Sequence, residues 1–336
     1  MTTQAHETAA LPGAGLIRTV LGDLAVLPEG IFLPHEHLLI HSPLIAATFP
    51  EILLDDVSTA VAELEECVPL GVAAIVDAMP MAAGRDAAGL AEVSRRTGVP
   101  VLASTGLHHD RYYGPDHWTN HLGVDDLAAL MIDDLVTGID EFDYTSPLVR
   151  RTSYRAGLIK LATSGATPDA RDVRNLRAAG AASLATGCPI LTHCEAGLGG
   201  VAQLDTLGAE GIPAESVIIS HTDKTADLAY VTELAAAGAV LEMDQAIRQR
   251  DLGSKGQSIK LVAALVEGGY ASQVVISADA AKRTFRHAYG GEPGLVWVVK
   301  ELPGLLGEIG LTADEIRMIT RENAERAYRW RGGEHR

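Results

Sequence analysis

The chain has 336 residues, of which 47% are hydrophobic and 21% are charged, a composition typical of a globular protein with a substantial core. Its 27 Lys and Arg against 44 Asp and Glu give a formal net charge of −17, which argues against a nucleic acid or an anionic membrane as its partner. An anionic small molecule is not excluded, because a few local cationic side chains can make a positive pocket in an acidic protein.

The N-terminus and the cysteines bear on the expected location. The first residues, MTTQAHETAALPGAG, lack a basic stretch followed by an apolar run, so we expect no signal peptide. No apolar run reaches the roughly 18 residues that cross a bilayer. Cys67, Cys188 and Cys194 are odd in number and lack zinc-finger spacing. We expect a cytoplasmic protein with reduced, mostly buried thiols.

Short apolar runs alternate with Ala-rich amphipathic stretches along the chain. Several runs are nearly all apolar, as expected of strands buried on both faces of a parallel sheet. The candidate strands are 31–38, 72–78, 99–105, 157–163, 189–194, 216–221, 239–243 and 273–279. The candidate helices between them include 56–67, 171–185, 224–237 and 258–266. Eight strand-then-helix units predict a (β/α)8 TIM barrel, with a doubly wound open sheet as the rival arrangement.

We expect residues 1–336 to form a single domain, because no linker rich in Pro, Gly or Ser divides the chain. A short extension, about 1–25, would precede the barrel. The long stretch 107–123 holds four His, two Tyr and a Trp, which is too much for a mere connector. The segment YGGEPG is a second candidate loop. Residues 312–330 predict two C-terminal helices, the first opening at Thr312 with Glu315 as a capping box.

Residues of metal-ligand type fall at the ends of four strands. His35 and His37 lie near the end of the first strand, His193 ends the fifth, His221 the sixth and Asp279 the eighth. The carboxyl ends of barrel strands meet at one face of the fold, where function sits. We therefore expect these side chains to converge there.

Each residue also has an ordinary structural interpretation, since a lone histidine in a strand is more often a hydrogen-bonded core residue and Asp279 could cap a helix. His35 and His37 are two apart, so both side chains point to the same side of a strand, and imidazole is a common zinc ligand. Lys160 lies in the apolar run LIKLA. A buried unpaired ammonium is costly, so this lysine must be neutralised, paired or chemically modified. Glu36 would face the helices, and we assign it a structural role.

The segments around these residues resemble the phosphotriesterase-related family of the amidohydrolase superfamily. The similar segments are LPHEHLLI around His35, LIKLATSG around Lys160, ILTHCEAG around His193, VIISHTD around His221 and VVISADAAKRTF around Asp279. YGGEPGL and ITRENAERAY are also similar. Together these segments run from strand one to strand eight in the family's order, which makes the match far more specific than any single motif.

The resemblance implies a metal-dependent hydrolase with a binuclear centre, in which zinc is expected and manganese or cobalt is possible. His35, His37 and Asp279 would hold the more buried ion, and His193 and His221 the more exposed one. Lys160 would be an N6-carboxylysine that bridges both ions, which answers the problem of its burial. A bridging hydroxide would attack the substrate, and Asp279 would carry the proton to the leaving group. The resemblance also makes a homodimer possible.

Two positions depart from the family's pattern. Phosphotriesterases relay a proton through a His at the end of strand seven and an Asp after strand six, where this chain has Gln245 and Lys224. Neither residue can play that part at neutral pH. A lactone, ester or amide needs a proton delivered to its leaving group, which Asp279 could do alone. Organophosphate triesters are therefore not the expected natural substrate.

Substrate contacts are sought in the loops that overhang such a site. Cationic side chains after strands seven and eight could bind a carboxylate, phosphate or sulfonate, although many of these residues could equally be surface charges. The candidate residues include Arg111, Tyr113, Lys282 and Arg286. The predicted contacts are His108, His109, Tyr112, Arg248 and Arg283.

These observations favour hydrolysis of a small-molecule lactone or other carboxylic ester. An amidase acting on an N-acyl substrate and a phosphotriesterase of the aryldialkylphosphatase type are alternatives within the same class. A non-catalytic ligand-binding protein is a more distant alternative, because every ligand position of the family is filled. We expect neither a nucleic acid nor a membrane as partner.

Overall fold

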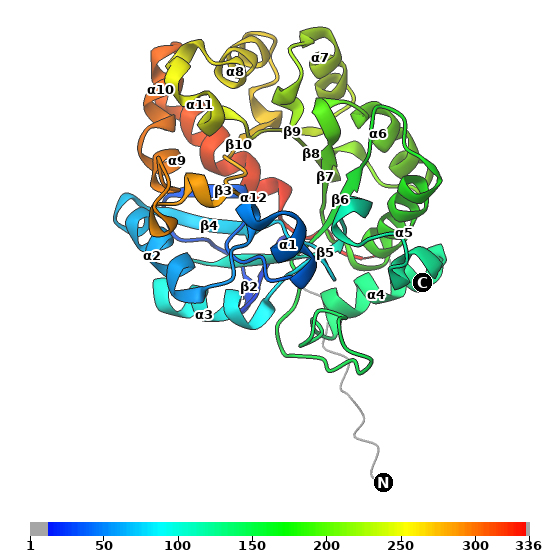
Figure 1. Ribbon diagram of the computed structural model, residues 1–336. Helices are drawn as coiled ribbons and strands as arrows, with labels where there is room; N and C mark the ends of the chain where they lie inside the picture. The colour runs from blue at the N-terminus through cyan, green and yellow to red at the C-terminus, as the bar shows by residue number, and fades with distance from the viewer. Residues whose placement is uncertain (1–12, 334–336) are drawn as a thin grey trace.

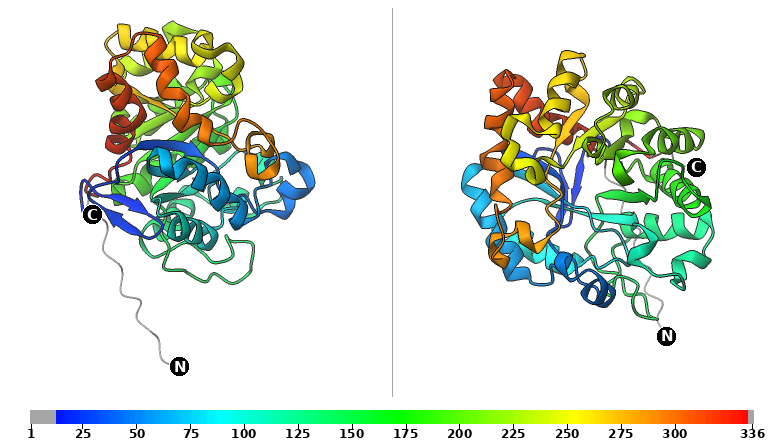
Figure 2. Two further views of the ribbon diagram at one scale, coloured as in Figure 1. Left: turned by 90° about the vertical axis from the view of Figure 1, so that its left-hand side faces the viewer. Right: turned by 45° about the horizontal axis from the view of Figure 1, so that its top comes forward.

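Eight parallel strands form a barrel with helices around its outside in the computed structural model of the chain, which describes residues 13–333 (Figure 1). Hydrogen-bonded neighbours follow the chain order from β3 (Ile31–Glu36) to β10 (Val274–Ile276), and each connection between them carries at least one helix. This ring of strands is seen from a second direction in Figure 2 (right). The predicted (β/α)8 barrel is confirmed. The doubly wound sheet is wrong, because its strand order would have to reverse.

Every predicted barrel strand is present, although most are shorter than expected. The barrel strands are β3 (Ile31–Glu36), β4 (Val72–Asp77), β5 (Val101–Leu107), β6 (Leu158–Thr163), β7 (Ile190–Cys194), β8 (Val217–Ser220), β9 (Val240–Met243) and β10 (Val274–Ile276). His37, His221 and Asp279 lie just past the strand ends. The chain leaves the ladder there, so these side chains are free to turn toward the barrel axis.

Helices form the outer layer of the barrel. They are α1 (Pro43–Thr48), α2 (Val57–Cys67), α3 (Ala87–Thr97), α4 (Val124–Val136), α5 (Ala170–Thr186), α6 (Gly200–Ala209), α7 (Leu228–Ala236), α8 (Gln257–Glu267), α9 (Val296–Lys300), α10 (Leu302–Glu308), α11 (Ala313–Arg317) and α12 (Asn323–Ala327). An aspartate side chain caps the first turn of four of them, accepting from a backbone N–H: Asp56, Asp86, Asp169 and Asp227. These caps satisfy N–H groups that have no partner within a helix.

The barrel closes between β3 and β10 through a side chain rather than through a regular strand ladder. The Glu36 carboxylate accepts hydrogen bonds from Ser277 Oγ (2.8 Å), Ala278 N (2.9 Å) and Ala280 N (3.0 Å). Asp279 N also donates to His35 O at 3.1 Å. The Glu36 carboxylate thus supplies the acceptors that a neighbouring strand would otherwise provide, which gives this residue the structural role expected from the sequence.

A short hairpin closes the amino-terminal end of the barrel (Figure 2, left). Strands β1 (Ile17–Thr19) and β2 (Gly22–Leu24) pair antiparallel, and Val20 N donates to the carbonyl of Val101 at the start of β5 (2.8 Å). Ile17 is fully buried against the apolar interior of the barrel, which Phe32 and Tyr328 also fill. The described part of the expected N-terminal extension is thus an integral cap. Residues 1–12 of that extension lie outside the described range.

The C-terminal segment is one continuous helical stretch and not the two helices predicted from the sequence. A π-helical turn at Met318–Glu322 joins α11 directly to α12. The capping box at Thr312 and Glu315 is confirmed, with both reciprocal hydrogen bonds present. None of the helices between residues 13 and 333 is long and apolar enough to cross a membrane.

Candidate metal centre and substrate cavity

The six residues singled out in the sequence converge at the carboxyl ends of the barrel strands. Five of them line a cavity of about 180 Å³: His35, His37, His193, His221 and Asp279. The sixth, Lys160, is buried beside them on β6, with Nζ 3.3 Å from His35 Nε2 and 3.4 Å from Ser220 Oγ. The structure thus brings together residues that are far apart in the chain: His35 and Asp279 are separated by 244 positions.

The first group of possible ligands comprises His35, His37 and Asp279, whose ligand atoms lie within 4.8 Å of one another. Asp279 Oδ1 is 3.4 Å from His37 Nε2, and Arg248 Nη2 is 3.1 Å from Asp279 Oδ2. Burial alone would raise the pKa of Asp279, but Arg248 and His37 hold it well below its usual range. The carboxylate is therefore ionised, as a metal ligand must be. The buried Nδ1 of His37 has no hydrogen-bond partner within residues 13–333.

The second group pairs His193 with His221. His193 Nδ1 is 2.7 Å from His221 Nε2, and the opposite ring nitrogens lie 2.9 Å from Glu195 Oε2 and 2.8 Å from Asp244 Oδ1, respectively. Burial lowers the pKa of His221 to about 4 and that of His193 well below its ordinary value, so both rings are neutral. A neutral His193 has one N–H and cannot donate to both Glu195 and His221. A cation between the two rings would accept both lone pairs and leave each N–H to its carboxylate.

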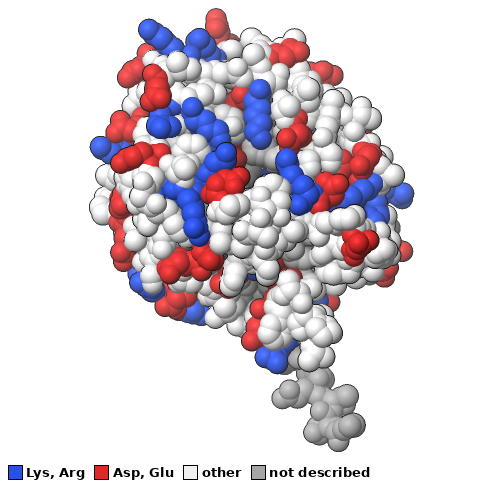
Figure 3. Space-filling model, in the orientation of Figure 1, with Lys and Arg blue, Asp and Glu red and all other residues white. Residues whose placement is uncertain are grey.

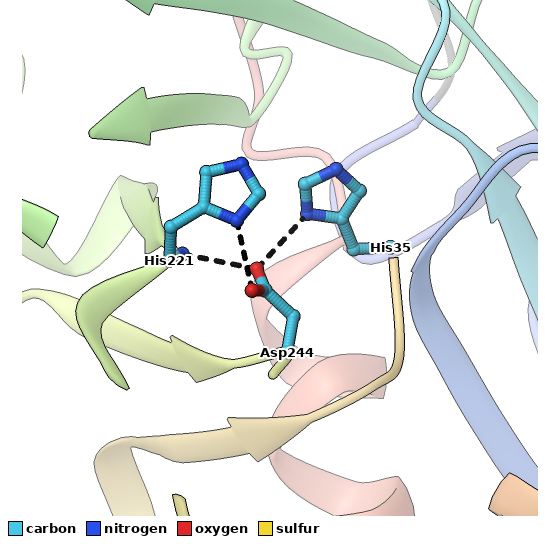
Figure 4. A group of neighbouring side chains, drawn as sticks. All are labelled: His35, His221 and Asp244. Carbon is cyan, nitrogen blue, oxygen red and sulfur yellow. Dashed lines mark hydrogen bonds and ion pairs between the residues drawn. The ribbon is translucent and has the colours of Figure 1, made fainter. Parts of the chain in front are cut away.

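Two acidic residues orient the imidazoles: Glu242 on β9 and Asp244 just after it. Figure 4 shows Asp244 between His35 and His221. Asp244 accepts from both the Nδ1–H and the backbone N–H of His221, and its Oδ2 lies 3.4 Å from His35 Nδ1. Glu242 Oε2 is 2.9 Å from the same His35 nitrogen. His35, His221 and Asp244 are close enough to form a ligand group themselves. We interpret the contacts as hydrogen bonds that turn both Nε2 atoms toward the cavity, an arrangement common around metal-binding histidines.

The electrostatics of His35 show that this position favours positive charge. Burial and Lys160 favour the neutral ring, but Glu242 and Asp244 outweigh them and raise the pKa of His35 to about 9. A metal ion would supply the same charge. Sequence reasoning missed Asp244 and Glu242, although their signal was available: two acidic residues in the otherwise apolar strand LEMD require the same explanation as Lys160.

Lys160 is fully buried, and this burial lowers the pKa of its amine to about 8. A neutral amine is the form that can react with CO2, so the environment fits the implied carboxylation. Gly106 on β5 makes room for this part of β6: a Cβ at Gly106, where φ is 100°, would lie 2.0 Å from the carbonyl oxygen of Lys160. Only glycine fits there.

Two of the possible ligands have strained backbones. His221 has a φ of 62° and Asp279 a φ of 44°, in the left-handed region that residues other than glycine seldom adopt. Such strain persists only where surrounding contacts fix it, and it is common at functional sites. The Asp244 and Glu36 hydrogen bonds described above supply such contacts for the two residues.

Glu195 joins the long loop after β5 to His193. Its Oε2 lies 3.0 Å from both His109 Nε2 and Arg111 Nη2, as well as 2.9 Å from His193 Nε2. The hydrogen bond with His193, together with nearby positive charge such as that of Arg111, holds the pKa of Glu195 well below its usual range. His109 does not line the cavity, whereas Glu195 does, so His109 contacts the cavity wall through this carboxylate. The sequence signal for Glu195 was its position two residues after a predicted ligand.

The predicted substrate contacts divide into two groups. His108, Tyr112 and Arg248 line the cavity, as do Arg111 and Lys282 from the wider set of candidates. Arg283 does not: its guanidinium contacts Leu53 O and, at 3.0 Å, Asp55 Oδ1. Tyr113 and Arg286 are buried and also lie off the cavity wall. We retain only the lining residues as candidates for binding a substrate.

The two departures from the family's pattern occupy different surroundings. Lys224 lines the cavity, whereas Gln245 is buried and donates to Asp244. Gln245 thus supports the network behind His221 and does not face a bound substrate. Ile40, Ile52 and Met79 form an apolar part of the cavity wall.

A (β/α)8 barrel with histidines, a lysine and an aspartate gathered at the strand ends defines the class of metal-dependent hydrolases. The sequence pattern of the Phosphotriesterase family matches residues 15–328, and the chain belongs to this family. It is 27% identical to a phospho-furanose lactonase of Mycoplasmopsis synoviae over 92% of this chain and 90% of that protein.

Two further similarities cover most of the chain. An aryldialkylphosphatase of Saccharolobus solfataricus is 26% identical over 89% of this chain and 95% of that protein. The crystal structure of an amidohydrolase from Mycoplasma synoviae superposes with a TM-score of 0.89 at 25% identity, covering 95% of this chain and 93% of that one. The chain is accordingly a metal-dependent hydrolase of the family.

Proposed function

We propose that this hydrolase opens a lactone or cleaves another carboxylic ester, and that this substrate carries an anionic group such as a phosphate. The observation that carries the proposal is the pair Lys224 and Lys282, which line the cavity and form no ion pair within residues 13–333. Their neighbours Arg111 and Arg248 are already paired, with Glu195 and Asp279 respectively. Two unpaired ammonium groups at a small cavity favour a substrate with a negative charge.

The charge distribution over the molecule supports this interpretation. Figure 3 shows Lys and Arg side chains around the hollow at the middle of the face, although the whole chain carries a formal net charge of −17. A cationic rim on an acidic protein concentrates positive potential where a small anion would enter. The relative named as a phospho-furanose lactonase makes a phosphorylated lactone a reasonable first substrate to test.

The donor set fits two divalent cations, zinc being expected. His35, His37 and Asp279 would hold one ion and His193 and His221 the other, with a carboxylated Lys160 between them. His193 and His221 are neutral imidazoles whose second ring nitrogens are bound by carboxylates, and Asp279 is an ionised carboxylate; these are states that metal ligation requires. When bound, the ions would lower the pKa of water toward neutrality and polarise the substrate carbonyl.

Asp279 is the proposed proton carrier. Its carboxylate is ionised and lies at the cavity wall, where it can accept a proton from the attacking water and deliver it to the departing oxygen. An alkoxide is a strong base, so it readily takes the proton from the protonated carboxyl group of Asp279. The absence of relay side chains at Gln245 and Lys224 therefore does not obstruct ester or lactone cleavage. Lys224 and Lys282 would hold the anionic end of the substrate at the cavity rim.

The test is a substrate panel with the metal-loaded protein: a phosphorylated γ-lactone, its uncharged counterpart, an aryl acetate, an N-acyl amide and a paraoxon-type triester. We expect the highest kcat/KM for the phosphorylated lactone. Lys224→Ala and Lys282→Ala should raise KM for that lactone about tenfold each, the loss of one charge-assisted contact. They should leave the uncharged lactone unaffected. Lys260→Ala, at an exposed lysine of α8 off the cavity, is the matched control.

Each other outcome points to a different function. Preferential turnover of the amide or the triester would identify an amidase or a phosphotriesterase and refute the ester proposal. Capture of the lactone without turnover by fully loaded protein would indicate a binding protein. Equal turnover of the charged and uncharged lactones, unaltered by the lysine variants, would leave a lactonase but refute the anionic subsite.

A further inference from the structure

Glu36, the residue between His35 and His37, accepts hydrogen bonds from the backbone on both sides of Asp279. Its Oε1 accepts from Ala278 N at 2.9 Å and its Oε2 from Ala280 N at 3.0 Å. Ser277 Oγ donates to the same carboxylate at 2.8 Å. Glu36 is fully buried, so these three donors meet the needs of a charge that has no access to water.

The position of Asp279 depends on these hydrogen bonds, because its own backbone conformation is unfavourable. A non-glycine residue with a φ of 44° returns to an ordinary conformation unless its neighbours are fixed. Asp279 N donates to His35 O on β3, and Arg248 Nη2 lies 2.8 Å from Asp279 O and 3.1 Å from its Oδ2, so the residue itself is bound to β3 by one backbone hydrogen bond and to Arg248 on the other side. Without the flanking bonds, the carboxylate would no longer be held 3.4 Å from His37 Nε2.

The guanidinium of Arg286 binds the same two segments, the loop of Asp279 and the end of β3. Arg286 is buried, and it donates from Nε to Ala280 O (2.8 Å) and from Nη2 to His37 O (2.6 Å). Its Nη2 lies 4.0 Å from Glu36 Oε2, close enough for the two charges to stabilise each other. The loop of Asp279 and the end of β3 are therefore held in one rigid unit.

We infer that Glu36 is a positioning residue for Asp279: it fixes the strained loop so that the carboxylate meets the two neighbouring histidines in the geometry that proton transfer needs. The segment His35-Glu36-His37 thus supplies two possible ligands and, between them, the acceptor that places a third. This inference rests on the proposed function, because it assumes that Asp279 acts in the reaction.

The test compares Glu36→Gln with Glu63→Gln at saturating metal. A glutamine at position 36 is isosteric but turns an amide N–H2 toward a backbone N–H, so one flanking bond is lost. Glu63 is the matched control: it is buried on α2 and also accepts two backbone N–H groups, from Ala288 (2.6 Å) and Leu295 (3.1 Å), away from the cavity. Both variants should lose similar thermal stability.

Only Glu36→Gln should lower kcat, by about 10- to 100-fold with little change in KM, as for other residues that orient a metal ligand. The acidic limb of its kcat–pH profile should also move, because the Asp279 carboxylate would lose its fixed distance from His37. A kcat within about twofold of wild type, or an equal loss in Glu63→Gln, would overturn the inference. Should Glu36→Gln fail to fold, Ser277→Ala removes a single donor, and an unchanged kcat there would overturn it.

Asp279→Asn separates this inference from the proposed function. An inactive Asp279→Asn with a fully active Glu36→Gln refutes the positioning role alone. An active Asp279→Asn refutes the proposed role of Asp279, and with it the basis of this inference.

Discussion

Asp244→Asn should weaken the metal centre without unfolding the barrel. The carboxylate accepts from His221 Nδ1–H at 2.8 Å and from His221 N at 3.0 Å, through different oxygens. An asparagine has one oxygen, so its amide N–H2 must face one of these two donors. The His221 ring would then gain stability in the other tautomer, with a proton on the Nε2 that should bind the ion. Removing such a partner commonly weakens metal binding about 10- to 100-fold.

That factor corresponds to about 1.4 to 2.7 kcal/mol of metal-binding free energy. The assay is competition between the protein and a chromophoric chelator for zinc, with bound metal per chain measured after dialysis. Asp140→Asn is the control, because Asp140 is equally buried and accepts from Tyr144 N (2.8 Å) and Arg150 N (2.6 Å) off the cavity. Zinc affinity in Asp244→Asn equal to that of wild type, or an equal loss in Asp140→Asn, would refute the reasoning.

Three further predictions follow from the same contacts. Removing metal with a strong chelator should abolish hydrolysis and lower the melting temperature, and added zinc should restore both; turnover by metal-free protein would contradict the centre. Burial raises the pKa of Cys67 and of Cys194 to about 12, above the unfolded value of 9.0, so the free energy of unfolding should fall as pH rises from about 9 to 12. Because all three cysteines are buried, a thiol reagent at pH 8 should label them only in urea. Gly106→Ala should destabilise the protein by about 2 kcal/mol or more, because its Cβ would meet Lys160 O, whereas Gly208→Ala in α6 should be neutral or stabilising by up to about 1 kcal/mol; equal melting temperatures would contradict the close approach.

The sequence by itself determined the barrel and the identity of the converging side chains. Buried parallel strands need apolar runs, and function in a barrel occupies the strand ends, so the position of His193 at the end of such a run was informative. The isolated charge of Lys160 could be recognised because a buried, unpaired ammonium in an apolar strand is costly. The capping box at Thr312 could be recognised because it is a local interaction within four residues.

Only the tertiary structure decided which side chains hold these residues in place. Asp244 reaches His221 from the next strand, and Glu195 reaches Arg111 across 84 positions of chain. Hydrogen bonds between segments so far apart have no fixed spacing, so no sequence pattern encodes them. The same reason explains why the partners of Glu36 could not be predicted: strand alternation indicates only the side of the strand, whereas the closure of the barrel brought the loop of Asp279 to its carboxylate.

The structure also separated the cationic residues that the sequence had grouped together. Arg283 and Lys282 are adjacent in the chain, yet Arg283 is bound to Asp55 while Lys282 lines the cavity. A residue's type and its position after a strand limit what it can bind, since only a cation attracts an anionic substrate. Whether it faces the cavity depends on the path of the loop and on which partner neutralises it first, and both are properties of the folded chain.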